Sequence, residues 1–139
     1  MSGNISEIVE FKDINIDTIQ SVLKNTGMTI SQRDENSFYA NTLGINSIVS
    51  VNNVFILIIV PFSIKDECDV ASLEKLISNI NKKLMLGELS INSHNKLLFT
   101  MSYMTNSGFY IPHLASTMAA FFASIKVLIK NNDLSEFIQ

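Results

Sequence analysis

The stretch VFILIIVPF, residues 54–62, most constrains the fold of this chain, because eight of its nine residues are apolar. A β-strand presents alternate residues to opposite faces, so both faces of this strand are apolar. An antiparallel sheet with one wet face alternates apolar and polar residues, and this stretch does not. Other structure must therefore cover each face of the strand.

Length and composition favour one folded domain. The chain has 139 residues, 47% of them hydrophobic and 17% charged. This length buries a sizeable core, and this composition excludes disorder. We expect a single domain over 1–139, with a core of about 13–130 and a polar tail, 131–139, that forms a short extra turn or is disordered.

Charge and targeting signals point to a cytoplasmic protein without a nucleic-acid or membrane partner. The net charge is −3, and Lys82 and Lys83 form the single basic cluster, whereas nucleic-acid binders carry basic patches. The lone Cys68 excludes an intrachain disulfide, which is typical of a reducing compartment. The opening MSGNISEIVEFKD is polar and acidic, unlike a signal peptide, and no run approaches the roughly 18 apolar residues of a membrane span.

Apolar residues at helical spacing predict three helices. The first begins near Asn15 or Asp17, either of which can cap it, and ends before Gly27. The second has an apolar stripe over 70–84, Asp69 as its cap and Gly87 after its end. The third covers 111–130, with a proline in its first turn.

Alternating segments predict the strands. Residues 28–43 form either one bent strand or two strands around a polar turn at 32–36, and 45–51 leads through a tight turn at Asn52–Asn53 into the apolar stretch. Because Pro61 has no N–H to donate, that strand ends there or runs along a sheet edge. Residues 88–91 and 97–103 form a hairpin around NSHN. The order α-β-β-β(-β)-α-β-β-α predicts an α+β fold, an antiparallel sheet flanked by helices.

The sequence offers no recognisable catalytic, metal or cofactor site. His94, His113 and Cys68 are scattered, without the spacing of a zinc site, and acidic neighbours disfavour a reactive thiolate at Cys68. The acidic pairs at 34–35 and 66–67 lie in polar turns, where we expect ordinary pKa values. The glycines are too far apart for a phosphate-binding loop. We therefore expect neither an enzyme nor a bound cofactor.

A cluster of methionine and aromatic residues offers a candidate contact surface. Such residues are enriched at the centres of protein interfaces, but they serve equally as core. The cluster surrounds the end of the 97–103 strand and its exit loop: Met101, Tyr103, Met104, Phe109 and Tyr110.

The second half of the chain resembles the YbjN family of bacterial proteins. The resemblance rests on a helix ending in NINKK, then a small residue, a hairpin and a long last helix, and it covers about residues 13–130. It implies a fold similar to that of the type III secretion chaperones, usually homodimeric, with a protein-binding or regulatory role and no catalytic residues. It also implies structural roles for Asn81, tethering a backbone group near the helix end, and for Gly87, permitting a tight exit.

We therefore expect a non-catalytic, chaperone-like or regulatory protein-binding module, with a partner that the sequence does not identify. One alternative is a small-molecule sensor or weakly active enzyme that uses a pocket between sheet and helices and draws on Tyr39, His94, Tyr103 or His113. Another alternative is an immunity-type protein, which would act by binding a toxin protein in the same non-catalytic way.

The apolar strand predicts how a homodimer forms. Phe55, Leu57, Ile59 and Pro61 share one face, and we expect the helices to cover one face only. We expect the partner subunit or edge structure to shield the opposite set, which adds five contact residues to the candidate surface: Val54, Ile56, Ile58, Val60 and Phe62.

Overall fold

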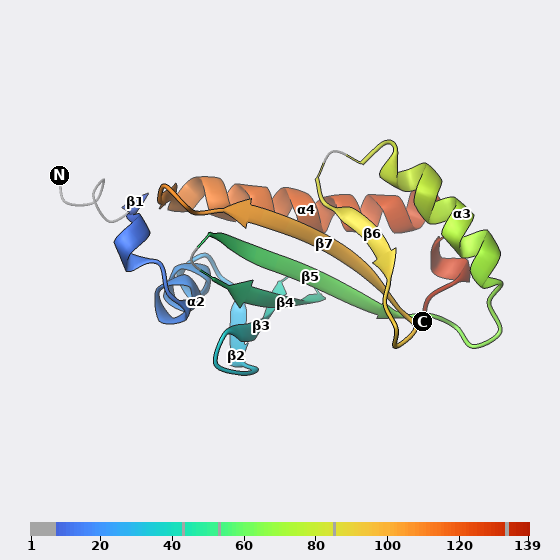
Figure 1. Ribbon diagram of the computed structural model, residues 1–139, viewed down its shortest axis with the longest axis horizontal. Helices are drawn as coiled ribbons and strands as arrows, with labels where there is room; N and C mark the ends of the chain where they lie inside the picture. The colour runs from blue at the N-terminus through green and yellow to red at the C-terminus, as the bar shows by residue number, and fades with distance from the viewer. Residues whose placement is uncertain (1–7, 43, 53, 85, 133) are drawn as a thin grey trace.

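A six-stranded antiparallel sheet backed by helices forms the body of the molecule (Figure 1). The computed structural model describes residues 8–42, 44–52, 54–84, 86–132 and 134–139. Within them the α-helices are α2 (Ile16–Asn25), α3 (Val70–Asn81) and α4 (Ile111–Asn131). In spatial order, the strands of the sheet are β2 (Thr29–Gln32), β3 (Ser37–Thr42), β4 (Ile45–Val51), β5 (Phe55–Ser63), β7 (Lys96–Met104) and β6 (Glu88–Ile91). The predicted α+β class and the order of these elements are confirmed.

Smaller elements join the two ends of the chain to this body, and of these only a short turn in the tail was among the alternatives that the sequence offered. Near the start of the described chain, β1 (Ile8–Val9) pairs with β8 (Phe109–Tyr110), and the 3-10 turn η1 (Phe11–Asp13) follows β1. A second 3-10 turn, η2 (Leu134–Glu136), lies after α4.

The predicted caps form where short polar side chains precede each helix. Asn15 Oδ1 accepts a hydrogen bond from the Thr18 N–H at 2.9 Å, so Asn15 rather than Asp17 caps α2. Asp69 accepts from the backbone N–H groups of Ala71 and Ser72 at the start of α3. Val70, predicted within the apolar stripe of α3, is instead 41% exposed, because the first helical residue lies ahead of the turns that pack on the sheet.

The helices lie on one face of the sheet. Figure 1 shows α4 along the length of β7, with α3 near β6 and α2 near β2 at the other end of the molecule. On that face Ile56 and Ile58 of β5 are fully buried, as are Phe121 and Phe122 of α4 to within 1%. All four belong to one continuous apolar cluster of the described residues.

Helix α4 contains no uninterrupted apolar run of the length of a membrane span, but it comes near one in overall composition. Its 21 residues, with a mean hydropathy of 1.4 in one 18-residue window, are long and apolar enough to span a membrane by length and composition. In this fold α4 instead turns a stripe of five residues into the core: Leu114, Met118, Phe121, Phe122 and Ile125.

The position of Pro61 corrects one expectation. Strand β5 neither ends at Pro61 nor lies at an edge, since it runs to Ser63 between β4 and β7. Asn52 N–H donates to Phe55 O, so the odd-numbered residues of β5 direct their backbone groups toward β4. The β4–β5 pairing stops at Ile48↔Ile59, so the missing N–H of Pro61 lies beyond the end of that ladder.

The structure decides between the alternatives that the sequence left open for two segments. Residues 28–43 contain two strands, β2 and β3, rather than one bent strand. Of the two alternatives for the tail, the structure shows the short extra turn, η2: Leu134 is fully buried, and Ile138 pairs with Ile64. Lys65 N–H donates to Phe137 O at 2.8 Å, which ties the tail to the end of β5. Of the predicted turn at Asn52–Asn53, Asn53 lies outside the described residues.

Candidate functional site

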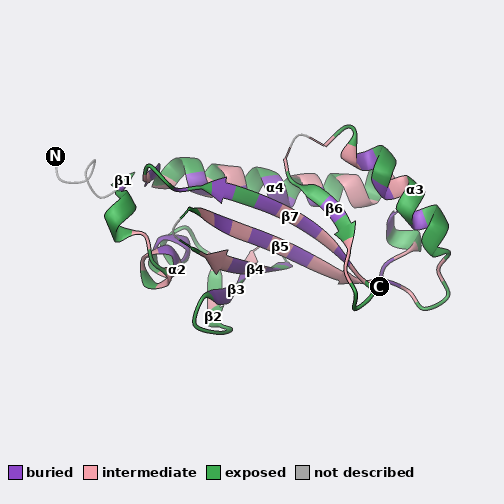
Figure 2. Cartoon of the chain, viewed as in Figure 1, coloured by how far each residue is buried: buried purple, intermediate pink, exposed green. Residues whose placement is uncertain are grey.

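The face of the sheet turned away from the helices carries an apolar centre with a polar surround. Its central row runs across the strands as Tyr39↔Ile48↔Ile59↔Thr100. We call this surface the open face and define its apolar centre by five half-buried residues: Ile48, Leu57, Ile59, Pro61 and Leu98. Figure 2 shows buried residues alternating with residues of intermediate burial along β5 and β7, which separates this face from the core.

Polar residues surround the apolar centre. Leu57 is paired with Ser50 on one side and Ser102 on the other. The Asn41 amide donates to Asn46 Oδ1 at 2.8 Å, next to the central row. An apolar centre inside a polar rim is the usual anatomy of a protein contact surface.

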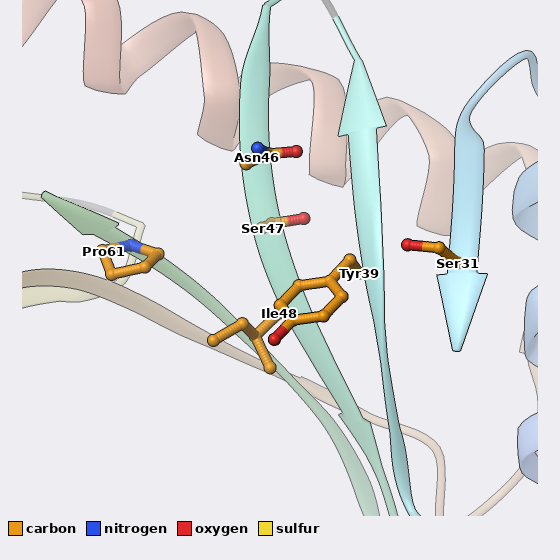
Figure 3. A pocket seen from close by; sticks show the side chains of 6 residues that line it. All are labelled: Ser31, Tyr39, Asn46, Ser47, Ile48 and Pro61. Carbon is orange, nitrogen blue, oxygen red and sulfur yellow. The ribbon is translucent and has the colours of Figure 1, made fainter. Parts of the chain in front are cut away.

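A shallow hollow of about 490 Å³ lies on the open face (Figure 3). The Tyr39 ring, 43% exposed, lies against it from β3, and Pro61 closes it from β5. Its six lining residues include no carboxylate, imidazole or amine: Ser31, Tyr39, Asn46, Ser47, Ile48 and Pro61. The hollow therefore offers shape and hydrogen bonds but no acid–base chemistry near neutral pH.

The structure reverses the expectation about which face of β5 is outward. Ile56, Ile58 and Val60 are at most 1% exposed and pack in the core under the helices. The set that includes Leu57 and Ile59 faces outward instead. Because both faces of this strand are apolar, the sequence pattern could not decide which one the helices would cover.

The other predicted contact residues divide between core and surface. Met101, Tyr103 and Phe109 are buried. Phe62 is half-buried and packs edge-on against Phe99 at 5.7 Å between ring centroids. The remaining three gather around the end of β7 and are exposed: Val54 by 47%, Met104 by 56% and Tyr110 by 49%.

Two of the four polar residues named for a sensor or enzyme come together. The Tyr103 hydroxyl lies 2.6 Å from His113 Nδ1, joining β7 to the first turn of α4. Burial raises the pKa of the Tyr103 hydroxyl above its ordinary value of 10.0. Tyr39 lies on β3, and His94 lies in the turn between β6 and β7, so neither joins the pair.

The Tyr103–His113 pair lines a second hollow of about 530 Å³ between β7 and α4. Nine residues surround it: Leu86, Ser102, Tyr103, Met104, Gly108, Phe109, Tyr110, His113 and Thr117. The Phe109 ring packs edge-on against the Tyr103 ring, with 6.0 Å between the ring centroids, and forms the floor of this hollow beside the Tyr103–His113 pair. No carboxylate or ammonium group lines this hollow.

The carboxylates of Asp34 and Asp69 have structural roles, and the pKa of Asp34 departs from expectation. The pKa of Asp34 is lowered, chiefly because its carboxylate accepts a hydrogen bond from the Asn36 backbone N–H. The pKa of Asp69 is lowered chiefly by the Ser72 hydroxyl. Lowered pKa values hold both groups ionised, which is unsuited to a general acid. Over the described ranges, no three His, Cys, Asp or Glu side chains gather as a metal site would require.

Asn81 and Gly87 have the structural roles that the resemblance implied. Asn81 donates to Leu89 O at 3.0 Å and accepts from Leu89 N–H at 2.8 Å, so it pairs with both backbone groups of one β6 residue. Gly87 has φ +73°, and a Cβ there would lie 2.2 Å from Thr100 O.

These features define a class: an α+β chain whose helices cover one face of a six-stranded antiparallel sheet and whose other face is open. The same fold occurs in the crystal structure of YbjN from E. coli, a protein proposed there as a transcription regulator. That structure matches with a TM-score of 0.75 and 16% sequence identity, over 91% of this chain and 96% of YbjN. No protein-family model and no curated protein sequence matches the chain. The chain thus has a YbjN-like fold, as its sequence indicated.

Proposed function

We propose that this chain is a non-catalytic protein-binding module, chaperone-like or regulatory, that acts in the cytoplasm and forms a homodimer. The observation that carries this proposal is the apolar centre of the open face. Large apolar side chains that stay partly exposed and adjacent in the middle of a sheet, rather than scattered singly, are characteristic of interaction sites.

A second copy of the chain suits this surface because the centre of the open face is uncharged. Two copies with a net charge of −3 each repel one another, and an uncharged contact surface adds no like-charge repulsion at close range. The central row from Tyr39 to Thr100 contains no charged residue, and the charged Glu88 is paired at its outer end, on β6. Sheet faces also pack on one another readily, at about 10 Å separation.

A regulatory role would act through protein contacts rather than through DNA. YbjN is proposed to regulate transcription, and this chain shares its fold. The net charge of −3 opposes binding to a phosphate backbone, however, and Lys82–Lys83 is the sole basic cluster in the sequence. An immunity-type protein would use the same kind of uncharged surface and falls within this proposal.

Methyl-group NMR over a range of protein concentrations tests where the chain associates. We expect the methyl resonances of Ile48, Leu57 and Ile59 to shift together as the protein is diluted from hundreds of micromolar to a few micromolar. The methyl resonances of Val127, 54% exposed on α4, should stay constant and serve as the control. Shifts confined to Val127, or no shift at any concentration combined with a monomer mass, would reject the open face as the contact.

A further inference from the structure

Strand β7 is longer than β6 beside it, and among the described residues part of its edge has no partner strand. β6 pairs with β7 from Ile91↔Leu97 to Glu88↔Thr100, but β7 continues to Met104. On that side, none of the strands in the described residues pairs with β7 beyond Thr100. Gly87 explains why β6 stops there, because its left-handed backbone turns the chain against Thr100 O.

The register identifies the backbone groups on this free edge. Asn92 N–H donates to Lys96 O at 3.0 Å toward β6, whereas Thr105 N–H donates to Val54 O at 2.9 Å on the opposite side. Successive strand residues direct their backbone groups to opposite edges. The N–H and C=O groups of Ser102 and Met104 therefore face the β6 side, beyond the end of β6.

The second hollow lies along this same free edge. Ser102 and Met104 line one side of it, and His113 and Thr117 of α4 line the other. The space is therefore a groove between a strand edge and a helix. Its apolar residues are Leu86, Met104 and Phe109, and the Tyr103–His113 hydrogen bond ties its two walls together.

We propose that this groove binds an extended peptide segment of a partner protein, which pairs with Ser102–Met104 as an added strand in line with β6. The inference rests on the proposed protein-binding function and names a second surface for it. Unpaired backbone donors and acceptors at strand spacing are complemented by another extended backbone, which supplies acceptors and donors at the same spacing. A small ligand cannot match both residues in this way.

The residues that line the groove determine which peptide sequences it would accept. Alternate side chains of an added strand would point into the hollow and toward the open face. The hollow has an apolar floor and no carboxylate or ammonium group in its lining, so a neutral aliphatic or aromatic residue fits there. The peptide residues before and after this apolar residue would lie beside Ser102 and Met104 on the open face. Polar side chains are compatible with those two positions.

Selection of random dodecapeptides displayed on phage, against the immobilised full-length chain, tests the proposal. Enriched peptides are synthesised and added to labelled protein. We expect alternating sequences with a central apolar residue, and slowed hydrogen exchange at the Ser102 and Met104 amides. Failure to enrich any peptide, or peptides that bind while both amides exchange as before, would overturn the proposal.

Matched variants separate this edge from the rest of the molecule. Ser102→Pro removes an N–H on the free edge, and this N–H takes no part in the hydrogen bonds between β7 and β5. This variant should weaken peptide binding at least tenfold. Ser102→Ala keeps the N–H and should bind the peptide within twofold of the parent chain. If Ser102→Pro does not fold, Thr117→Arg fills the hollow from α4 and should abolish binding. Ile59→Asp alters only the open face and should leave peptide binding unchanged, so failure of this inference is distinguishable from failure of the proposed dimer. Equal binding by Thr117→Arg or Ser102→Pro and the parent would contradict the assignment.

Discussion

The Asn81 side chain forms two hydrogen bonds with Leu89, donating to its carbonyl oxygen and accepting from its backbone N–H. Leu89 is buried on β6, eight residues beyond Asn81 in sequence. This pair fixes the end of α3 to the edge of the sheet.

Replacing Asn81 with Ala should lower the free energy of unfolding by about 2 kcal/mol, because it leaves two buried backbone groups without partners. Chemical denaturation measures the loss. Asn79→Ala, on the exposed side of the same helix, is the control and should change stability by less than about 0.5 kcal/mol. Equal effects of the two substitutions would contradict the role assigned to Asn81.

Gly87→Ala and Gly44→Ala form a second matched pair. Both glycines have positive φ, but a Cβ at Gly44 meets nothing within 4 Å, whereas one at Gly87 collides with Thr100 O. Gly44→Ala should therefore cost about 1 kcal/mol from backbone strain alone. Gly87→Ala should cost about 2–4 kcal/mol, because the collision adds to the strain. Thermal and urea unfolding of both variants provide the comparison, and a Gly87→Ala loss no larger than that of Gly44→Ala would show that the chain relaxes around the collision.

Stability should fall at high pH because of Tyr103. Burial raises its pKa in the folded state above the value of 10.0 that it has when unfolded. Above pH 10 the unfolded chain then loses this proton first, so stability is complete below pH 10 and declines as pH rises through the folded pKa. The stability of the Tyr103→Phe variant should decline less steeply than that of the parent chain between about pH 10 and pH 11.5, as urea denaturation measures. A Tyr103→Phe curve parallel to the parent curve would refute the assignment.

Thr105 offers a substitution that should not destabilise the protein. Its hydroxyl is fully buried and has no hydrogen-bond partner within the part of the chain that the structure describes. Thr105→Val should leave the free energy of unfolding unchanged or raise it by up to about 1 kcal/mol, since it removes a buried hydroxyl that forms no hydrogen bond to offset its loss of hydration. Ser47→Ala is the contrast: Ser47 donates to Ala40 O at 2.9 Å, and its loss should cost about 1 kcal/mol. Destabilisation by Thr105→Val as large as that of Ser47→Ala would show that the hydroxyl has a partner.

Local patterns in the sequence predicted most of the fold. Helical spacing and caps located α2, α3 and α4, and alternation located the strands, because those signals depend on residues close in the chain. The two-residue strands β1 and β8 escaped prediction, since each is defined by a partner about a hundred residues away rather than by its own pattern.

The site was harder to predict than the fold for the same reason. Both faces of β5 are apolar, so only the tertiary packing of α2 and α4 decided that Ile58 is buried and Ile59 is outward. Tyr103 and His113 were named separately, but their contact depends on the return of α4 along β7. The free edge at Ser102–Met104 has no signal in the sequence, because it results from the difference in length between β6 and β7.

The mass of the protein in solution tests the central claim, that the open face is a contact surface. Light scattering on the parent chain at micromolar concentration should give twice the 15.5 kDa of one chain. Ile59→Asp should give a monomer mass with an unchanged circular dichroism spectrum, and Val127→Asp, which places the same charge on α4, should remain a dimer. A monomeric parent chain, or an Ile59→Asp variant that stays dimeric, would contradict the account.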